Sequence, residues 1–305
     1  MTTPIRYEDL LAQLAERDPA LVVMTAENRA AIRGLPPRLG PRFIDVGIAE
    51  QTLVGMAAGL ALRGRRPVAH ALATFLVFRA YEFVRDDLAI PGLPVKLIGG
   101  VPGFLSDANG PTHQAIEDIA LMRGLPNMQV FTPASEAELV AGMKVLMDVE
   151  RPCYVRYYAG PSPVAEPAPF RVGKAEVISR GADVALLTYG FLLKEALAAK
   201  ARLEADGLSV GLVNLRMLKP VDTEAILEAT QGARVTLTIE DHFKVGGLYS
   251  IVAETLLAAR ATAKVVPVAL DDRWFKPTLL GEVLRHEGFT GEQLAARARA
   301  ALDHA

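Results

Sequence analysis

Residues 43–72, FIDVGIAEQTLVGMAAGLALRGRRPVAHAL, contain the pattern from which the fold can be predicted. An apolar, β-branched run at 43–46 is followed by a helical pattern at 49–64, and a second apolar run begins at residue 67. A strand, a helix and a strand in this order predict a parallel βαβ unit. The helix is apolar on nearly all faces, so we expect it to be buried, in the core or at a subunit interface. Gly64 marks its end.

The same alternation of short apolar runs and helical patterns continues along the chain, and it is typical of parallel-sheet α/β proteins. It is interrupted at 159–170, AGPSPVAEPAPF, a proline-rich stretch that reads as a linker. We therefore predict two consecutive parallel-sheet α/β domains, 1–165 and 166–305. The expected strands are 21–25, 43–46, 67–72, 95–99, 128–132, 154–158, 183–190, 209–216, 234–240 and 264–270.

Composition excludes several classes of protein. The chain has 305 residues, of which 51% are hydrophobic and 22% charged, enough for about two well-buried domains. The net charge of -2 argues against a nucleic-acid-binding role. Apolar stretches are interrupted before the roughly 20 residues that a membrane span needs, and the start of the chain lacks the apolar segment of a secretory signal. We expect a soluble, cytoplasmic protein.

No metal site built from this chain is expected. Cys153 is the only cysteine, in the strand-like CYVRYY, where we expect a buried and inert thiol. The histidines lack the spacing of zinc ligands, and no HExxH string occurs.

Six side chains of the first domain are candidates for chemistry because they follow expected strands, where α/β proteins place ligands. Each also has a plainer interpretation: an acid in a first helical turn interacts with the helix dipole, aromatics at helical spacing form a core face, and a loop histidine stabilises a turn. The candidates are Glu50, then Phe75, Phe78 and Tyr81 in TFLVFRAY, and Asn109 and His113 in DANGPTHQ.

The order of these strings resembles the transketolase family. FIDVGIAEQ at 43–51, TFLVFRAY at 74–81 and GPTHQAIEDIALMRGLPNMQVFTPA at 110–134 resemble its pyrimidine-binding domain. LRMLKPVDTEAIL at 215–227 and TIEDHFKVGGLYSIVAETL at 238–256 resemble its C-terminal domain. The resemblance covers nearly the whole chain, and the motifs follow in the same order.

The resemblance implies a thiamine-diphosphate enzyme. In this family a carboxylic acid hydrogen-bonds the aminopyrimidine ring nitrogen of the cofactor, and Glu50 matches that acid. Burial would favour the protonated form that donates this bond. Phe75, Phe78 and Tyr81 match the aromatic wall around the pyrimidine. His113 matches a histidine that hydrogen-bonds the substrate as charge develops on it.

The other half of the family's cofactor site is missing. Single-chain members carry an upstream domain whose GDG motif and a following Asn hold Mg²⁺ and the diphosphate, and no GDG occurs in this sequence. The resemblance therefore implies a partner subunit that supplies this half, in an α2β2 heterotetramer with thiamine diphosphate shared at subunit interfaces.

The substrate end departs from the family pattern. Asn109 replaces the usual acidic residue, Val101 and Pro102 lie where a His or Arg is expected, and Ala159 lies where a phosphate-binding Arg is expected. Each such charged contact is typically worth about 1.5–3 kcal/mol. Arg156 is nearby and is retained as a substrate candidate, although strand alternation could point it elsewhere.

We therefore expect a substrate other than an ordinary sugar phosphate, or an anion bound elsewhere, by Arg29, Arg33 or the partner. The main hypothesis is transfer of a two-carbon ketol from a ketose. The alternative is a decarboxylating acyl transfer from a 2-oxo acid, as in deoxyxylulose-phosphate synthases or 2-oxo-acid dehydrogenase beta subunits. The spacing in TFLVFRAY favours the first, whereas FIDVGIAEQ resembles the synthases. A purely scaffolding subunit is a third reading, against which Glu50 and His113 argue.

Overall fold

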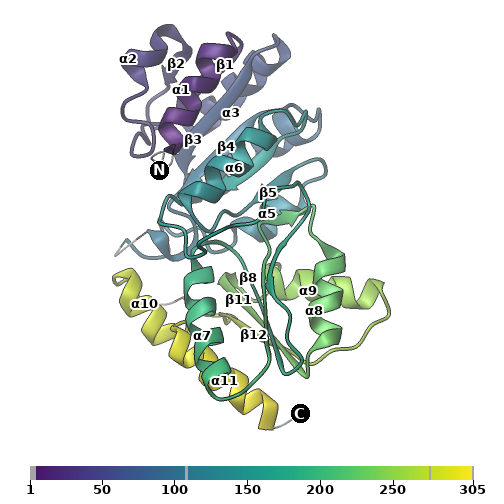
Figure 1. The fold of residues 1–305 in the computed structure, drawn as a ribbon. Coiled ribbons are helices and arrows are strands. Elements are labelled where there is room, and N and C mark those ends of the chain that lie inside the picture. Colours follow the sequence, from purple (N-terminus) through teal and green to yellow (C-terminus); the bar gives the residue numbers. More distant parts are fainter. Residues whose placement is uncertain (1–4, 107–108, 275, 304–305) are drawn as a thin grey trace.

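The computed structural model describes residues 5–106, 109–274 and 276–303, which form two layered α/β units (Figure 1). The first unit is built on a seven-stranded sheet of order β10-β5-β6-β4-β3-β1-β2. The second is built on a five-stranded sheet of order β12-β11-β8-β9-β7. Two α/β units in succession are the predicted fold class.

All ten expected strands are present, but two further strands make the sheets mixed. The short strands β7 and β10 both pair antiparallel with their neighbours. β10 comes from the second half of the chain, but it extends the first sheet beside β5. No single residue therefore separates the strands of the first sheet from those of the second. The strands are β1 (Leu21–Thr25), β2 (Phe43–Asp45), β3 (Arg66–Leu72), β4 (Lys96–Gly100), β5 (Gln129–Phe131), β6 (Cys153–Arg156), β7 (Glu176–Ser179), β8 (Val184–Thr188), β9 (Val210–Asn214), β10 (Met217–Lys219), β11 (Val235–Phe243) and β12 (Val265–Leu270).

Helices cover the faces of both sheets (Figure 1). None of those in the described ranges is long and apolar enough to cross a membrane. The helices are α1 (Tyr7–Arg17), α2 (Pro36–Leu39), α3 (Glu50–Leu62), α4 (Tyr81–Phe83), α5 (Asp118–Gly124), α6 (Glu136–Leu146), α7 (Leu193–Ala205), α8 (Thr223–Gly232), α9 (Leu248–Ala258), α10 (Leu280–Glu287) and α11 (Gly291–Asp303).

Strand alternation divides the core of the first unit into two layers. Val22 and Met24 of β1 point into a cluster shared with α3 and α5, whereas Leu21 and Val23 point into a cluster with α1 and α6. Successive side chains of a strand lie on opposite faces of its sheet, so one apolar strand serves both layers. This is why the parallel strands read as unbroken apolar runs.

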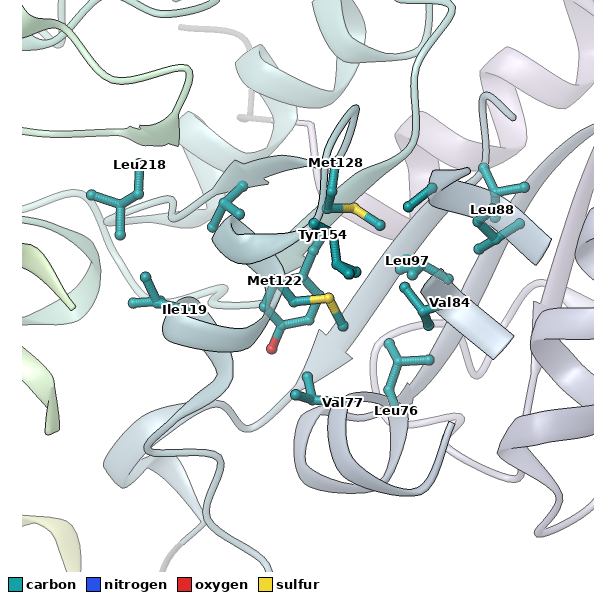
Figure 2. Close-up of a cluster of buried hydrophobic side chains, with 14 of the residues drawn as sticks. Leu76, Val77, Val84, Leu88, Leu97, Ile119, Met122, Met128, Tyr154 and Leu218 are labelled. Carbon is teal, nitrogen blue, oxygen red and sulfur yellow. The ribbon is translucent and has the colours of Figure 1, made fainter. Parts of the chain in front are cut away.

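One hydrophobic cluster joins the two units. It begins around α3 and α5 and continues into α8 and α9, which cover the second sheet. Figure 2 shows part of it, which runs from Leu97 of β4 past Met122 to Ile119 of α5 and Leu218 of β10. A separate cluster fills the other face of the second sheet beneath α7 and α11. The two units therefore share a core.

The expectation that α3 is buried holds for only one of its faces. Leu53, Val54 and Ala57 are buried. Met56 and Leu62 are 41% and 70% exposed, so an apolar strip of this helix lies on the surface of the chain.

Candidate functional site

Glu50 is the first residue of α3, at the edge of the first sheet where β2 ends, and only 2% of it is exposed. The connection from β2 turns at Gly47, whose φ is 73° and whose N–H donates to the Asp45 carboxylate at 2.9 Å. The positive end of the helix dipole stabilises an acid at this position. The expected burial of Glu50 is present.

Arg79 is the partner of Glu50 and is not among the predicted residues. Its Nη1 donates to Glu50 Oε2 at 2.8 Å, and its guanidinium carbon lies 4.4 Å from the centre of the Phe75 ring. Residues Phe75–Arg79 form a π-helical turn, in which the Ala80 N–H reaches back to the Phe75 carbonyl. Phe75 and Arg79 are four residues apart and would also be neighbours on an α-helix. The contact between Arg79 and Glu50 joins residues 29 apart in sequence, so a local helical pattern does not reveal it.

The three predicted aromatic residues have different surroundings. The Phe75 ring packs edge-on against the His113 ring, with centroids 5.3 Å apart. Phe78 is exposed, and the Tyr81 hydroxyl donates to the Leu121 carbonyl of α5 at 3.1 Å. Among the described residues, Phe75 is the one aromatic of the three that contacts both Arg79 and His113. A shared wall of three rings stays a prediction.

His113 and Asn109 lie on the connection between β4 and α5, of which residues 107 and 108 are outside the described ranges. The His113 N–H donates to the Gly110 carbonyl at 3.0 Å, and its Nδ1 lies 2.9 Å from Thr112 Oγ1. Asn109 Nδ2 donates to Ser106 Oγ at 3.2 Å. The Asn109 amide thus braces the loop, and His113 is the loop side chain that meets Phe75.

Arg156 does not have the surroundings of a substrate ligand. It is 4% exposed, and its Nη1 and Nη2 donate to the two Asp241 oxygens at 2.7 and 3.2 Å. Its Nε donates to Asp118 at 2.9 Å. Alternation along β6 turns Arg156 to the same face as Tyr154, which also bonds Asp118. In the chain alone Arg156 belongs to a buried ion cluster, and its contact with substrate stays a prediction.

Val101 and Pro102, two of the positions that depart from the family pattern, bring no charged side chain to the start of the loop. Pro102 is buried, and Val101 has a φ of 45°. A β-branched residue in this left-handed region is strained, and such strain is concentrated at functional sites. Of the two alternative anion ligands, Arg29 already binds Asp45, with Nε 2.8 Å from Oδ2, whereas Arg33 is exposed.

Two expectations about reactive groups can be compared with the structure. Cys153 is a free, buried thiol, and burial raises its pKa to about 12, which makes it inert as expected. Within the described ranges, no group of three or more His, Cys, Asp or Glu side chains is arranged to hold a metal ion.

Two family models match the chain. The transketolase pyrimidine-binding domain matches residues 1–160, and the transketolase C-terminal domain matches residues 173–294. The chain belongs to the transketolase family. Proteins of the transketolase family use thiamine diphosphate.

Its relatives include both single-chain and subunit forms. The 1-deoxy-D-xylulose-5-phosphate synthase of Synechococcus sp. (strain JA-2-3B'a(2-13)) is 38% identical over 301 residues, which cover 95% of this chain and 46% of the synthase. The chain thus spans about half the length of such synthases. The 6-deoxy-6-sulfo-D-fructose transketolase subunit SqwH of Clostridium sp. (strain MSTE9) is 35% identical over 254 residues, 82% of this chain and 79% of SqwH.

A solved structure described as a split gene transketolase, inactive beta4 tetramer, matches with a TM-score of 0.88. It is 35% identical, and the match covers 97% of both chains. Transketolase structures from Pichia stipitis match with TM-scores of 0.76–0.77 at 18–19% identity, which shows the shared fold alone.

Proposed function

We propose that this chain is the cofactor-activating subunit of a split, transketolase-like enzyme that transfers a two-carbon ketol or a related acyl unit. The observation that carries the proposal is the buried Glu50 carboxylate, which Arg79 links to the Phe75 ring, together with the His113 ring that packs edge-on against Phe75. The likeness to a split transketolase over 97% of both chains supports it.

The chemistry of these residues fits the aminopyrimidine half of thiamine diphosphate. A heteroaromatic ring needs a hydrogen-bonding acid for its ring nitrogen and an apolar face for stacking, which Glu50 and Phe75 offer. Arg79 is 43% exposed, so it can leave Glu50 without opening the core. When bound, the cofactor supplies an acidic thiazolium carbon that becomes the nucleophile.

Each residue then has a defined task. Glu50 holds a proton against the ring nitrogen, and its burial keeps water from competing for that bond. Phe75 covers one face of the aminopyrimidine ring and helps to orient it. His113 donates a hydrogen bond to the substrate carbonyl or hydroxyl on which charge develops. Phe78 and Tyr81 complete the aromatic surroundings once the partner is in place.

A partner subunit of the diphosphate-binding type completes the site in this proposal and holds Mg²⁺, in an α2β2 heterotetramer. The apolar strip beside Glu50 supports a docked partner here: Ile48 is 72% exposed, and Met56 and Leu62 follow along α3. Several exposed apolar side chains on and beside one helix favour an interaction surface there.

The proposed donor is not an ordinary sugar phosphate. Val101, Pro102 and Ala159 offer no charge, and Arg156 is committed to Asp118 and Asp241. SqwH, which is named for 6-deoxy-6-sulfo-D-fructose, shows by its name that a relative is associated with a different anion. Arg33 or the partner would bind the anion of the donor.

The second candidate is decarboxylating acyl transfer, which the 38% identity to a deoxyxylulose-phosphate synthase favours. The assembled complex would be offered ketoses and 2-oxo acids in parallel. Release of an aldehyde from the ketose supports ketol transfer, whereas release of CO₂ from a 2-oxo acid supports the alternative.

Replacement of Glu50 by Gln tests the proposal, because the amide keeps the shape but cannot supply the acidic proton. In the complex with the diphosphate-binding subunit, exchange of the cofactor C2 hydrogen and turnover should both fall about 100-fold or more. Glu228→Gln, an exposed acid on α8, is the control and should exchange normally. Unchanged exchange and turnover in Glu50→Gln would contradict the proposal and favour a scaffolding subunit.

A further inference from the structure

A fully buried ion cluster lies where the two units meet. Arg156 of β6 in the first sheet binds Asp241 of β11 in the second sheet through both terminal nitrogens. Its Nε binds Asp118 at the start of α5, which also accepts the Tyr154 hydroxyl at 2.7 Å. The Arg156 guanidinium lies 5.5 Å from the centre of the buried Tyr189 ring.

Such a cluster is a costly way to join two units. Apolar side chains of similar volume usually stabilise a junction as well or better, because charges must be stripped of water before they pair. The shared hydrophobic cluster already joins the two units here. Stabilising the junction is therefore not a sufficient explanation for these buried charges.

The cluster is positioned at both ends of the loop that carries His113. At the start of the loop, Gly103 packs against the cluster so closely that a Cβ there would lie 1.8 Å from Asp241 Oδ2. The Gly103 N–H crosses the loop to the Ala115 carbonyl at 2.9 Å. Asp118 closes the loop at its other end.

Residues that flank Asp241 in sequence hold the same loop. The Phe243 N–H donates to the Ile116 carbonyl at 3.2 Å, and His242 Nε2 accepts the Ala120 N–H at 3.2 Å. In addition, Gly110 lies against Pro277, because a Cβ at Gly110 would come within 2.5 Å of it. The C-terminal half of the chain thus contacts the loop at its beginning, middle and end.

We propose that Arg156 and Asp241 are positioning residues for His113, through which the C-terminal unit sets the substrate end of the site. They do not touch substrate; they hold residues 101–106 and 109–117 so that the His113 ring lies against Phe75. Glu50 approaches from α3 and is outside this arrangement. The proposal rests on the proposed function for the role of His113 toward the substrate.

Two variants perturb the cluster in different ways. Asp241→Asn keeps the shape but removes one acceptor charge, whereas Gly103→Ala keeps both charges but forces the loop and the Arg156–Asp241 pair apart, because its Cβ would overlap both side chains. In the assembled complex, each should lower kcat/KM about 10–100-fold, the loss expected of a displacement near 1 Å. Exchange of the cofactor C2 hydrogen, which reports on Glu50, should stay within about 2-fold of the wild-type rate. Arg180→Gln, which breaks the exposed pair with Glu228, is the matched control.

A double variant separates positioning from general damage. If Asp241 acts through His113, the variant His113→Ala/Asp241→Asn should be no slower than His113→Ala alone. Losses that multiply would overturn the proposal, as would C2 exchange that falls as far as turnover.

Hydrogen–deuterium exchange of the free chain gives a readout that needs no activity. Asp241→Asn should accelerate amide exchange over residues 109–117 about 10-fold or more and leave β1 to β3 unchanged. An unchanged rate over 109–117 would overturn the positioning role. A wild-type complex that turns over neither ketoses nor 2-oxo acids would instead contradict the proposed function.

Discussion

His242 is wholly buried at the junction of the two units, and its ring nitrogens have opposite roles. Nδ1 lies 2.6 Å from the Phe243 carbonyl and donates to it, whereas Nε2 accepts the Ala120 N–H. A single neutral tautomer satisfies both bonds. Burial lowers the pKa of His242 from 6.5 to about 4; among its charged neighbours Asp118 opposes this shift and Arg156 adds to it.

This pKa predicts a dependence of stability on pH. Because the folded value of about 4 lies below the ordinary 6.5, the neutral ring contributes stability fully above pH 6.5 and loses it as the pH falls toward 4. His242→Asn should lower the free energy of unfolding by about 1–3 kcal/mol at pH 7.5. The gap to wild type should narrow by pH 4.5, as measured by urea unfolding.

The exposed His286 on α10 is the control for this experiment. Its replacement by Asn should leave the free energy of unfolding unchanged at each pH, because exposed substitutions have small effects. A gap for His242→Asn that is constant from pH 7.5 to 4.5 would show that the ring does not resist protonation.

Site residues that belong to a sequence motif can be predicted, whereas residues placed by packing between distant segments cannot. Glu50 and His113 could be named from their strings, and the structure brings both to Phe75 through Arg79 and a ring contact. Arg79 could not, since its partner Glu50 is 29 residues away in sequence. The ion pairs of Arg156 could not be predicted either, since its partner Asp241 is 85 residues away in sequence.

Among the elements, α3 carries both a residue of the candidate site and exposed apolar side chains. Glu50 occupies its first turn, and the apolar strip consists of Ile48 just before the helix and Met56 and Leu62 along it. The helix reads as apolar all round because it covers the core on one face and, as we propose, the partner on the other.

A charge on this strip should prevent assembly without unfolding the chain. Met56→Lys is expected to weaken association with the diphosphate-binding subunit about 10-fold or more, because an interface core excludes unpaired charge. Val145→Lys on α6 is a matched control, since Val145 is 38% exposed and Met56 41%. Sedimentation of mixed subunits would measure both. Equal affinity for the two variants would place the partner elsewhere.

Element prediction found the parallel strands, including the edge strands β2 and β12, and missed the two short antiparallel strands. The ten expected strands are largely apolar runs. β7 and β10 have four and three residues and pair antiparallel, so neither shows a period long enough to recognise. The register of β10 is determined by a strand of the other unit, which local sequence does not contain.

For the whole molecule, the proposed boundary at 165/166 divides the sequence but not the core. β10 belongs to the first sheet, and the middle hydrophobic cluster contains side chains of α3, α5, α8 and α9. A fragment 1–165 would expose the side of α5 and the edge of β5 that the second half covers.

Such a fragment should therefore not fold alone. We expect residues 1–165 to show no cooperative thermal transition by circular dichroism, because a large share of its apolar surface stays in water. Co-expression of 1–165 with 166–305 should restore the transition and give a complex that copurifies. A cooperative transition of 1–165 by itself would mean that the shared core is dispensable.

The crossing strand also matters while the chain is being made. β5 can pair with β6 once residue 156 is available, but its other edge stays open until residue 219 has left the ribosome. An open strand edge is a template for pairing with another nascent chain. Over that interval of synthesis the growing polypeptide should depend on chaperones, and slow translation between β6 and β10 would prolong the exposure.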